Sequence, residues 1–282
     1  MPLVSTRELV DEAVAAGSGV AAFNVITLEH AEAIAAGAER AGRPAILQIS
    51  QNAVAFHHRL APIADATAAV ARASGARLGL HLDHVVSPAL VEAAPAAGFG
   101  SVMVDASKLP YEQNVARTAE LVDFGHRHEL WVEAELGRVG GKDGEPPLDA
   151  HAPGVRTDPA EAAAYVAATG VDALAVAVGS SHAMTERTAA LDHALIRRLR
   201  ASVPVPLVLH GSSGVPDDEI RAAIAAGMVK INVGTALNTA FTAAVREQLT
   251  ARPDVVDPRK YLAPAREAMA ATVAAFLALL PA

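Results

Sequence analysis

The chain has 282 residues, of which 52% are hydrophobic and 19% charged, and its formal net charge is −8. This composition is typical of a folded globular protein and excludes a disordered chain. Aromatic residues make up only 4% of the chain and lysine and arginine form no cluster, so we expect no nucleic-acid partner. The absence of cysteine excludes disulfides, thiolate metal ligands and a cysteine nucleophile.

Neither end of the sequence predicts a secreted or membrane protein. Residues Met1–Arg7 lack the charged-then-apolar order of a signal peptide. The apolar run Ala270–Pro281 is too short to span a bilayer. We therefore expect a cytoplasmic protein with no membrane partner.

Short apolar runs alternate along the chain with longer alanine-rich segments of helical period, which is the pattern of βα units. The predicted strands are Gly19–Val25, Pro44–Ile49, Arg77–Leu82, Ser101–Val104, Glu129–Leu136, Ala173–Val178, Pro206–Leu209 and Val229–Val233. The predicted helices are Leu28–Ala41, Pro88–Ala97, Tyr111–Arg127, Pro159–Thr169, Leu195–Ala201 and Asp217–Ala226. Eight strands separated by helices predict one (β/α)8 TIM barrel over residues 1–282, with a C-terminal helical extension.

One segment, Gly137–Thr157, interrupts this pattern because it is rich in glycine and proline. Loops beside a barrel site commonly close over the substrate. We therefore predict that residues 137–157 form a mobile loop.

Polar side chains stand at the carboxyl ends of the predicted strands, where parallel α/β folds build their sites. Three ends supply histidine: His84 after the third strand, His182 after the sixth and His210 after the seventh. Neutral imidazoles that converge on one point indicate a metal site. The other polar residues at strand ends are Asn24, Ser50, Asp105, Glu133, Glu135, Asn232 and Thr235.

The third strand carries His81, Asp83 and His84 close together. Alternate residues of a strand face opposite sides, so His81 and Asp83 share a direction and His84 does not. We predict that the chain leaves the strand here, which lets Asp83 and His84 both reach the barrel mouth. The remaining histidines fall in predicted helices or loops and are expected at the surface: His30, His57, His58, His126, His128, His151 and His193.

The motifs at these strand ends resemble those of the class II, metal-dependent ketose-bisphosphate aldolases, especially the tagatose- and fructose-bisphosphate branch. The resemblance implies reversible retro-aldol cleavage of a phosphorylated ketose to dihydroxyacetone phosphate and an aldehyde. The similar segments follow the family's order over most of the chain: Ala22–Val25, His81–His84, Val132–Gly137, Gly140–Gly141, Gly179–His182, Leu209–Pro216 and Lys230–Val233.

The resemblance also implies roles for individual residues. His84, His182 and His210 would bind one divalent ion, usually Zn²⁺, and Glu135 would be an inner or alternative ligand. Nitrogen-rich sites also take Co²⁺, Fe²⁺ or Mn²⁺. Asp83 would be the general acid/base on the hydroxyl at the cleaved bond. The residues expected to contact substrate or its phosphate are Asn24, Ser50, Gly179, Gly211, Ser212, Ser213, Asn232, Gly234 and Thr235.

Further expectations concern other partners of the chain. The family resemblance implies a monovalent cation, Na⁺ or K⁺, near the substrate. It also implies a homodimer or homotetramer, for which the apolar segment Ala263–Leu280 is the expected contact surface.

The predicted loop departs from the family pattern. The family motif there contains a glutamate that is a candidate base for the ketone half of the substrate. Residues Gly140–Gly144 are one residue short of that motif and lack the glutamate. Asp143 or Glu145 would have to supply this second base.

Other departures fall near the expected phosphate positions. Ala183 and Glu186 stand where the family has a glycine and a phosphate-binding lysine, and Gly234 and Asn238 replace an aspartate and a basic residue. The missing aspartate favours a tagatose-like or other ketose. The missing positive charge argues against a standard second phosphate, because Arg or Lys normally holds such an anion.

Alternative functions remain open from the residues alone. A metal-dependent barrel hydrolase would also use a histidine cluster, but such enzymes usually carry a His-x-His pair on the first strand, which here offers only Asn24. A non-catalytic, aldolase-like partner subunit would not require Asp83 and three histidines together. A Schiff-base mechanism would need a lysine, and Lys230 alone lies in a predicted strand.

Overall fold

The computed structural model describes residues 3–137, 139–140 and 155–281. Its eight strands are parallel and pair in chain order to form a closed barrel, which confirms the predicted TIM barrel. The strands are β1 (Val20–Asn24), β2 (Ala45–Ser50), β3 (Leu78–Val85), β4 (Ser101–Val104), β5 (Trp131–Leu136), β6 (Ala173–Val176), β7 (Leu207–Leu209) and β8 (Met228–Val233).

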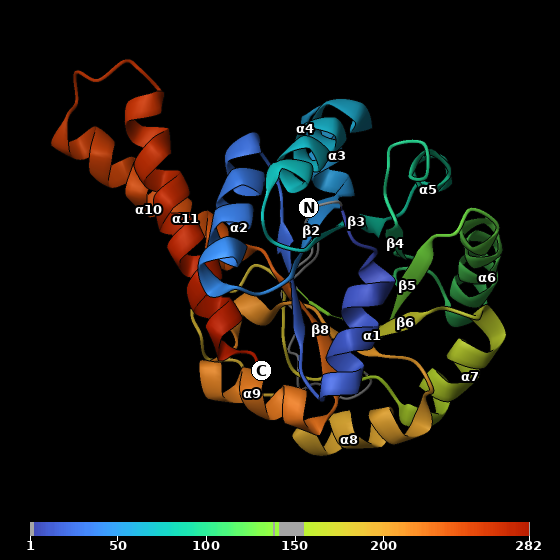
Figure 1. Cartoon of the computed structure of the whole chain (residues 1–282). Coiled ribbons are helices and arrows are strands. Elements are labelled where there is room, and N and C mark those ends of the chain that lie inside the picture. Colours follow the sequence, from blue (N-terminus) through green and yellow to red (C-terminus); the bar gives the residue numbers. More distant parts are fainter. Residues whose placement is uncertain (1–2, 138, 141–154, 282) are drawn as a thin grey trace.

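Helices surround the barrel on its outer face (Figure 1). They are α1 (Thr6–Ala16), α2 (Leu28–Ala41), α3 (Gln51–Phe56), α4 (Leu60–Ala73), α5 (Pro88–Ala93), α6 (Tyr111–Arg127), α7 (Pro159–Thr169), α8 (His193–Ser202), α9 (Asp217–Ala226), α10 (Thr235–Ala251) and α11 (Arg259–Leu279). Four predicted helices, α2, α6, α7 and α9, have their predicted bounds. Local start signals explain part of this agreement: Asp158 accepts hydrogen bonds from the first turn of α7, and Pro159 occupies the first helical position.

Helix α1 closes the amino-terminal end of the barrel. Its buried Leu9 and Val10 belong to an apolar cluster with inward-facing strand residues, among them Ile46, Trp131 and Val208. This cluster fills the lower part of the barrel interior. The charged side chains of the described barrel interior lie above this cluster, toward the carboxyl end where the site lies.

The middle of the barrel holds charged and polar side chains that are shielded from solvent. His81, Glu133 and Lys230 are each fully buried, and Gln48 is 1% exposed. Gln48 on β2 lies beside His81 on β3 in the strand register. Groups of this kind are stable inside a protein only when they are paired or hydrogen-bonded.

Helices α10 and α11 form an antiparallel hairpin that projects from one side of the barrel (Figure 1). Among the described residues, α11 alone is long and apolar enough to cross a membrane, a property it shares with packed helices of globular proteins. Its residues Met269, Val273 and Leu277 are buried, and Val273 packs against Gly37 of α2. The apolar face of α11 is therefore used within the chain. The predicted mobile loop, residues 137–157, lies largely outside the described residues.

Candidate functional site

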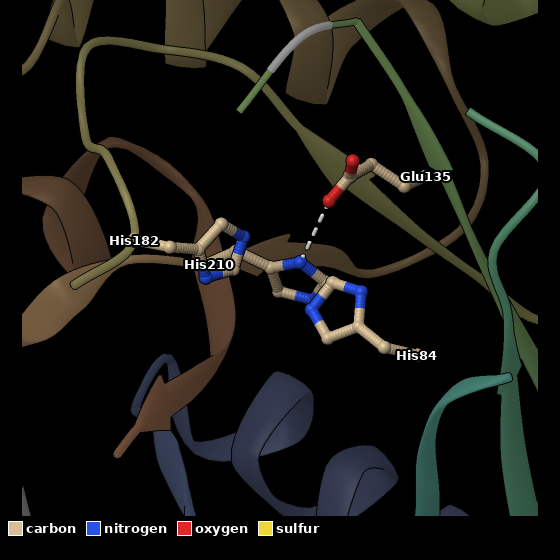
Figure 2. Close-up of side chains that lie close together, drawn as sticks. All are labelled: His84, Glu135, His182 and His210. Atoms are coloured by element: carbon tan, nitrogen blue, oxygen red, sulfur yellow. Dashed lines mark hydrogen bonds and ion pairs between the residues drawn. The ribbon is translucent and has the colours of Figure 1, made fainter. Parts of the chain in front are cut away.

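Three histidines and a glutamate converge at the carboxyl end of the barrel (Figure 2). His84 comes from β3, Glu135 from β5, His182 from the segment after β6 and His210 from the end of β7. One ligand atom of each residue lies within 4.8 Å of the others. The ring centroid of His84 lies 5.1 Å from that of His182 and 4.8 Å from that of His210. Sequence reasoning expected these residues to meet, and the structure brings all of them together.

The backbone of His84 explains how two consecutive residues reach the same cavity. Strand β3 continues to Val85, so the prediction that the chain leaves the strand at Asp83–His84 is wrong. The pairing of β3 with β4 instead shifts register between Leu82 and Val85, and His84 has a positive φ of 48°. This bulge turns the side chain of His84, and both Asp83 and His84 line the cavity.

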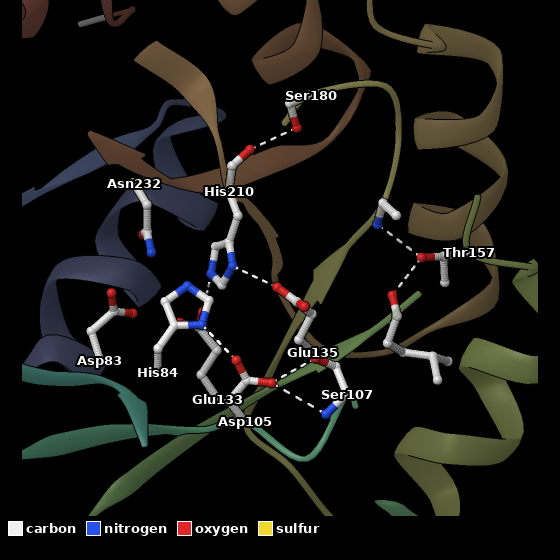
Figure 3. Close-up of polar contacts among 12 residues, drawn as sticks. Asp83, His84, Asp105, Ser107, Glu133, Glu135, Thr157, Ser180, His210 and Asn232 are labelled. Carbon is white, nitrogen blue, oxygen red and sulfur yellow. Dashed lines mark hydrogen bonds and ion pairs between the residues drawn. The ribbon is translucent and has the colours of Figure 1, made fainter. Parts of the chain in front are cut away.

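His210 lies between two buried carboxylates (Figure 3). Its Nδ1 is 2.8 Å from Oε2 of Glu135, and its Nε2 is 3.0 Å from Oε1 of Glu133. Burial alone would lower the pKa of His210, but the hydrogen bonds to Glu133 and Glu135 outweigh it and raise the pKa to about 9. This position therefore favours a positive charge, which a bound divalent cation would supply in place of a proton.

Further hydrogen bonds hold His84 and His210 in place. Nδ1 of His84 lies 2.8 Å from Oδ2 of Asp105, and Asp105 in turn accepts hydrogen bonds from the backbone and side chain of Ser107. Ser180 donates a hydrogen bond of 2.6 Å to the backbone carbonyl of His210. Carboxylates that accept the second N–H of a ligating histidine orient the ring and strengthen metal binding. The residues present therefore fit a divalent ion held by three imidazoles and a carboxylate.

Asp83 stands next to this cluster as a buried anion. It is 2% exposed, and its Oδ1 has no hydrogen-bond partner within the described residues. Burial favours the neutral acid, but the electrostatic effects of His84 and Lys230 outweigh it and hold the pKa of Asp83 below its ordinary value. An ionised carboxylate at the cavity wall is able to accept a proton from a bound substrate.

The cavity at the barrel mouth has a volume of about 310 Å³. Most of the predicted substrate residues line it: Asn24, Ser50, Gly211, Ser213, Asn232, Gly234 and Thr235. Two predicted substrate residues, Gly179 and Ser212, are not on its wall. Ser212 is 1% exposed, and its hydroxyl donates to the backbone carbonyl of Asn232. Its role here is to join the ends of β7 and β8.

Two glycines have structural reasons to be glycine. Gly211 has a φ of 67°, and a Cβ there would lie 2.5 Å from the backbone of Ser181. Gly179 has a φ of 124°, and a Cβ there would lie 2.4 Å from the carbonyl oxygen of Ala190. Both positions therefore require the chain to pack without a side chain. Ala183 likewise has a positive φ of 57°, which an L-residue adopts at a cost.

Several cavity residues were not predicted from the sequence. The wall also contains Gln48, Gln51, Asn52, Lys108 and Ser181, together with Asn238, which the sequence singled out only as the replacement of a basic residue. Lys108 is the only lysine or arginine among the described residues of the wall. These side chains come mostly from loops and helix starts that follow a strand. Their position just after a strand end is the feature of the sequence that could have predicted them.

Lys230 was considered from the sequence as a Schiff-base lysine. Lys230 is fully buried. Its Nζ lies 2.8 Å from Oε2 of Glu133 and donates a hydrogen bond to Oδ1 of Asn232. Lys230 does not line the described cavity wall. Lys230 therefore neutralises a buried carboxylate beneath the site.

Comparisons with known proteins agree with this geometry. The family model for class II fructose-bisphosphate aldolase matches residues 4–282. The YdjI aldolase from Escherichia coli K12 is 31% identical, with a TM-score of 0.84 over 98% of this chain and 96% of that one. A candidate fructose-1,6-biphosphate aldolase from Coccidioides immitis is 29% identical, with a TM-score of 0.86 over 97% and 95% of the two chains. A fructose-bisphosphate aldolase from Campylobacter jejuni, 22% identical, shares the fold with a TM-score of 0.79 over 97% and 94%.

The fold and the site define a metal-dependent barrel enzyme, and the chain belongs to the class II fructose-bisphosphate aldolase family. It is an aldolase that carries out retro-aldol cleavage, uses a divalent metal ion and acts on phosphorylated sugars. The resemblance drawn from the strand-end motifs is thereby confirmed. Family membership favours a lyase over the two alternatives, a barrel hydrolase and a non-catalytic subunit.

Proposed function

We propose that this aldolase cleaves a phosphorylated ketose to dihydroxyacetone phosphate and an aldehyde, with Asp83 as the catalytic acid/base. One observation carries the proposal: Asp83 and two of the three clustered histidines, His84 and His182, line the same cavity. Zinc is the proposed ion because three imidazoles suit it. His84, His182 and His210 would hold it, with Glu135 as an additional or alternative ligand.

Asp83 would move the proton in both directions of the reaction. In cleavage, its carboxylate takes the proton from the hydroxyl on the carbon that becomes the aldehyde. The adjacent carbon–carbon bond then breaks, and its electron pair stays with the ketone half. In condensation, Asp83 returns the proton to the new hydroxyl. When bound at His84, His182 and His210, a divalent ion would supply Lewis-acid polarisation of the ketone, the role that a Schiff-base lysine has in other aldolases.

The phosphate of the ketone half would lie at the ends of β7 and β8. Ser213 and Thr235 line the cavity there, and Gly234 precedes the first turn of α10. Backbone N–H groups at the start of a 17-residue helix attract an anion. This placement leaves the β1–β3 side of the cavity, which contains Asp83, to the aldehyde half. A Na⁺ or K⁺ ion beside the phosphate stays a prediction.

A cytoplasmic homodimer or homotetramer stays the proposed state of the protein. The contact surface proposed from the sequence, Ala263–Leu280, needs revision because its most apolar face packs within the chain. Helix α10 offers more free surface: Leu237 is its one buried residue, while Leu249 is 38% exposed. Light scattering of the purified protein measures the number of subunits, and a monomer at micromolar concentration contradicts this proposal.

A substrate screen tests the proposed reaction. The protein would be loaded with zinc, its metal content measured, and cleavage assayed with ketose 1-phosphates and ketose bisphosphates that differ at C4. We expect release of dihydroxyacetone phosphate from at least one of these sugars. Stoichiometric zinc without cleavage of any of them would contradict the proposed substrate class.

A further inference from the structure

His30 is buried at the edge of the cavity, although its place in a helix predicted a surface position. It lies in the first turn of α2 and is 4% exposed. Its Nε2 is 3.2 Å from Oδ1 of Asn238 on α10, and its ring stacks on Phe241 with centroids 5.5 Å apart. His30 therefore joins the starts of two helices that follow neighbouring strands, β1 and β8.

The hydrogen bonds of His30 determine which ring nitrogen carries its hydrogen. The backbone N–H of Thr27 points at Nδ1 of His30, with an N···N distance of 3.3 Å. Oγ1 of Thr27 also lies 3.1 Å from Nδ1, but a hydrogen on Nδ1 would oppose the hydrogen that the backbone N–H always carries, so we assign Nδ1 as the acceptor. Burial lowers the pKa of His30 and keeps the ring neutral, with one hydrogen. That hydrogen is on Nε2, and Nε2–H donates to Oδ1 of Asn238.

This contact fixes the amide of Asn238, which lines the cavity. Its oxygen accepts from His30, so the other end of the amide, the NH₂ group, is the end available to a ligand. An amide held in this way only donates hydrogen bonds to a ligand. The substrate group opposite Asn238 must therefore be an acceptor, such as a hydroxyl oxygen.

Asn238 lies in the first turn of α10, and its side chain contacts His30 at the start of α2, the helix after β1. The side chain is therefore directed toward the β1 side of the cavity, which the proposed function assigns to the aldehyde. The neighbouring wall is neutral and polar, with Asn24, Gln48 and Ser50. The only cationic side chain of the described wall, Lys108, follows β4, which is next to β3 and across the barrel from β8, so this lysine lies toward the Asp83 side and not beside Asn238.

Given the proposed aldolase function, we propose that His30 is a positioning residue that holds Asn238 as a hydrogen-bond donor to a hydroxyl oxygen of the aldehyde. The aldehyde is then a hydroxylated, non-phosphorylated sugar fragment. A phosphate would need Arg or Lys beside Asn238, and the described part of the wall there has neither. Dihydroxyacetone phosphate thus contributes the phosphate group of the sugar.

Three variants separate this role from a structural one. N238D keeps the shape and the bond from His30 but replaces the NH₂ donor by an oxygen. H30E retains an acceptor for the Thr27 N–H but no donor for Asn238, so the amide of Asn238 reverses. H30Q keeps both an acceptor and a donor, because glutamine at this helix position completes a capping box. H30E and H30Q thus differ only in one terminal group.

The zinc-loaded enzyme would be assayed for condensation of dihydroxyacetone phosphate with glyceraldehyde, glyceraldehyde 3-phosphate and propanal. We expect wild type to prefer glyceraldehyde to both other aldehydes. N238D and H30E should lower the glyceraldehyde-to-propanal ratio of kcat/KM about tenfold, mainly through KM, because one hydrogen bond is lost. H30Q should keep most of the ratio. The exposed H128Q is the control variant.

The outcomes separate the two proposals. No condensation with any aldehyde by zinc-loaded wild type overturns the aldolase substrate class. Active variants with an unchanged glyceraldehyde-to-propanal ratio overturn the role of His30 and Asn238, as does a wild-type preference for glyceraldehyde 3-phosphate. Long-range ¹H–¹⁵N NMR of histidine-labelled protein gives a test without activity, with H30Q assigning the resonance. A neutral ring with hydrogen on Nε2 supports the inference, and hydrogen on Nδ1 overturns it.

Discussion

Asp105 fixes the orientation of His84. Its Oδ2 lies 2.8 Å from Nδ1 of His84, so this nitrogen donates to the carboxylate and Nε2 is left for the proposed metal ion. Asp105 comes from the residue after β4 and His84 from the bulge of β3, and the two strands are neighbours in the barrel. The carboxylate therefore selects both the tautomer and the direction of the His84 ring. The backbone of His84 is itself unusual, with a positive φ.

Removing this carboxylate should weaken metal binding. We expect D105A to lower the affinity for Zn²⁺ by about 10- to 100-fold, because the ring loses its orienting partner and its basicity. Competition with a chromophoric chelator measures the affinity. D123N, at an exposed position of α6, is the matched control. Equal affinities of D105A and wild type would show that His84 is positioned by other contacts.

Asp83 should be needed for the reaction and dispensable for the metal. We expect D83A to bind one zinc ion per chain with near wild-type affinity and to lose about 10²- to 10⁴-fold in kcat, the usual size of general acid/base effects. Metal analysis and a coupled assay for dihydroxyacetone phosphate measure the two properties. H182A should instead lose zinc, and activity with it, because this substitution removes a proposed metal ligand. Near-normal turnover by D83A would assign the proton transfer to another group.

The sequence was sufficient to predict the barrel and the convergence of three histidines at its rim. The ends of parallel strands share one rim, so His84, His182 and His210 had to approach each other once their strands were identified. Four helices between the strands also kept their predicted bounds, since caps such as Asp158–Pro159 are local signals. The bulge at His84 was not predictable, because it depends on the register between β3 and β4.

The sequence did not predict contacts between side chains on distant segments. Glu133 and Lys230 are readable as polar residues in strands, but their ion pair requires the register of a closed barrel that brings β5 and β8 side chains to the same depth. His30 and Asn238 are 208 residues apart, and each taken alone has the pattern of a helix surface. Sequence periodicity assigns a residue to a face of its own element but not to a partner on another element.

The buried ion pair beneath the site should matter for stability. K230M leaves Glu133 charged and without its 2.8 Å partner, and we expect a loss of about 3–5 kcal/mol in the free energy of unfolding. The double variant K230M/E133Q removes both charges and should recover much of that loss. Urea unfolding measures all three proteins. A double variant no more stable than K230M would show that the charges are not coupled in this way.

Lys230 should also be inert toward the substrate. Because its ammonium group is fully buried and bound to Glu133 and Asn232, we expect no covalent adduct with dihydroxyacetone phosphate after borohydride reduction. Mass spectrometry of the intact protein measures this. A stoichiometric mass increase on Lys230 would restore the Schiff-base alternative.

His81 should make the metal-free protein sensitive to acid. It is fully buried, with Nδ1 2.8 Å from Oγ of Ser101, and burial together with Lys230 lowers its pKa to about 3. The unfolded chain has the ordinary value near 6.5, so between about pH 6.5 and 3 the unfolded state binds more protons. Stability contributed by His81 is therefore present above about pH 6.5 and is lost as the pH falls through this range.

We expect H81Q to reduce this dependence, since glutamine keeps a polar group near Ser101 but does not titrate. Between pH 6 and 4, the slope of the unfolding free energy against pH should be lower than in wild type by up to about 1.4 kcal/mol per pH unit. Urea titrations of both proteins in chelator, at several pH values, measure the two slopes. H81Q will be less stable near neutral pH if the imidazole also packs well, and this offset does not change the slope. Parallel slopes for the two proteins would mean that carboxylates, and not His81, determine acid unfolding.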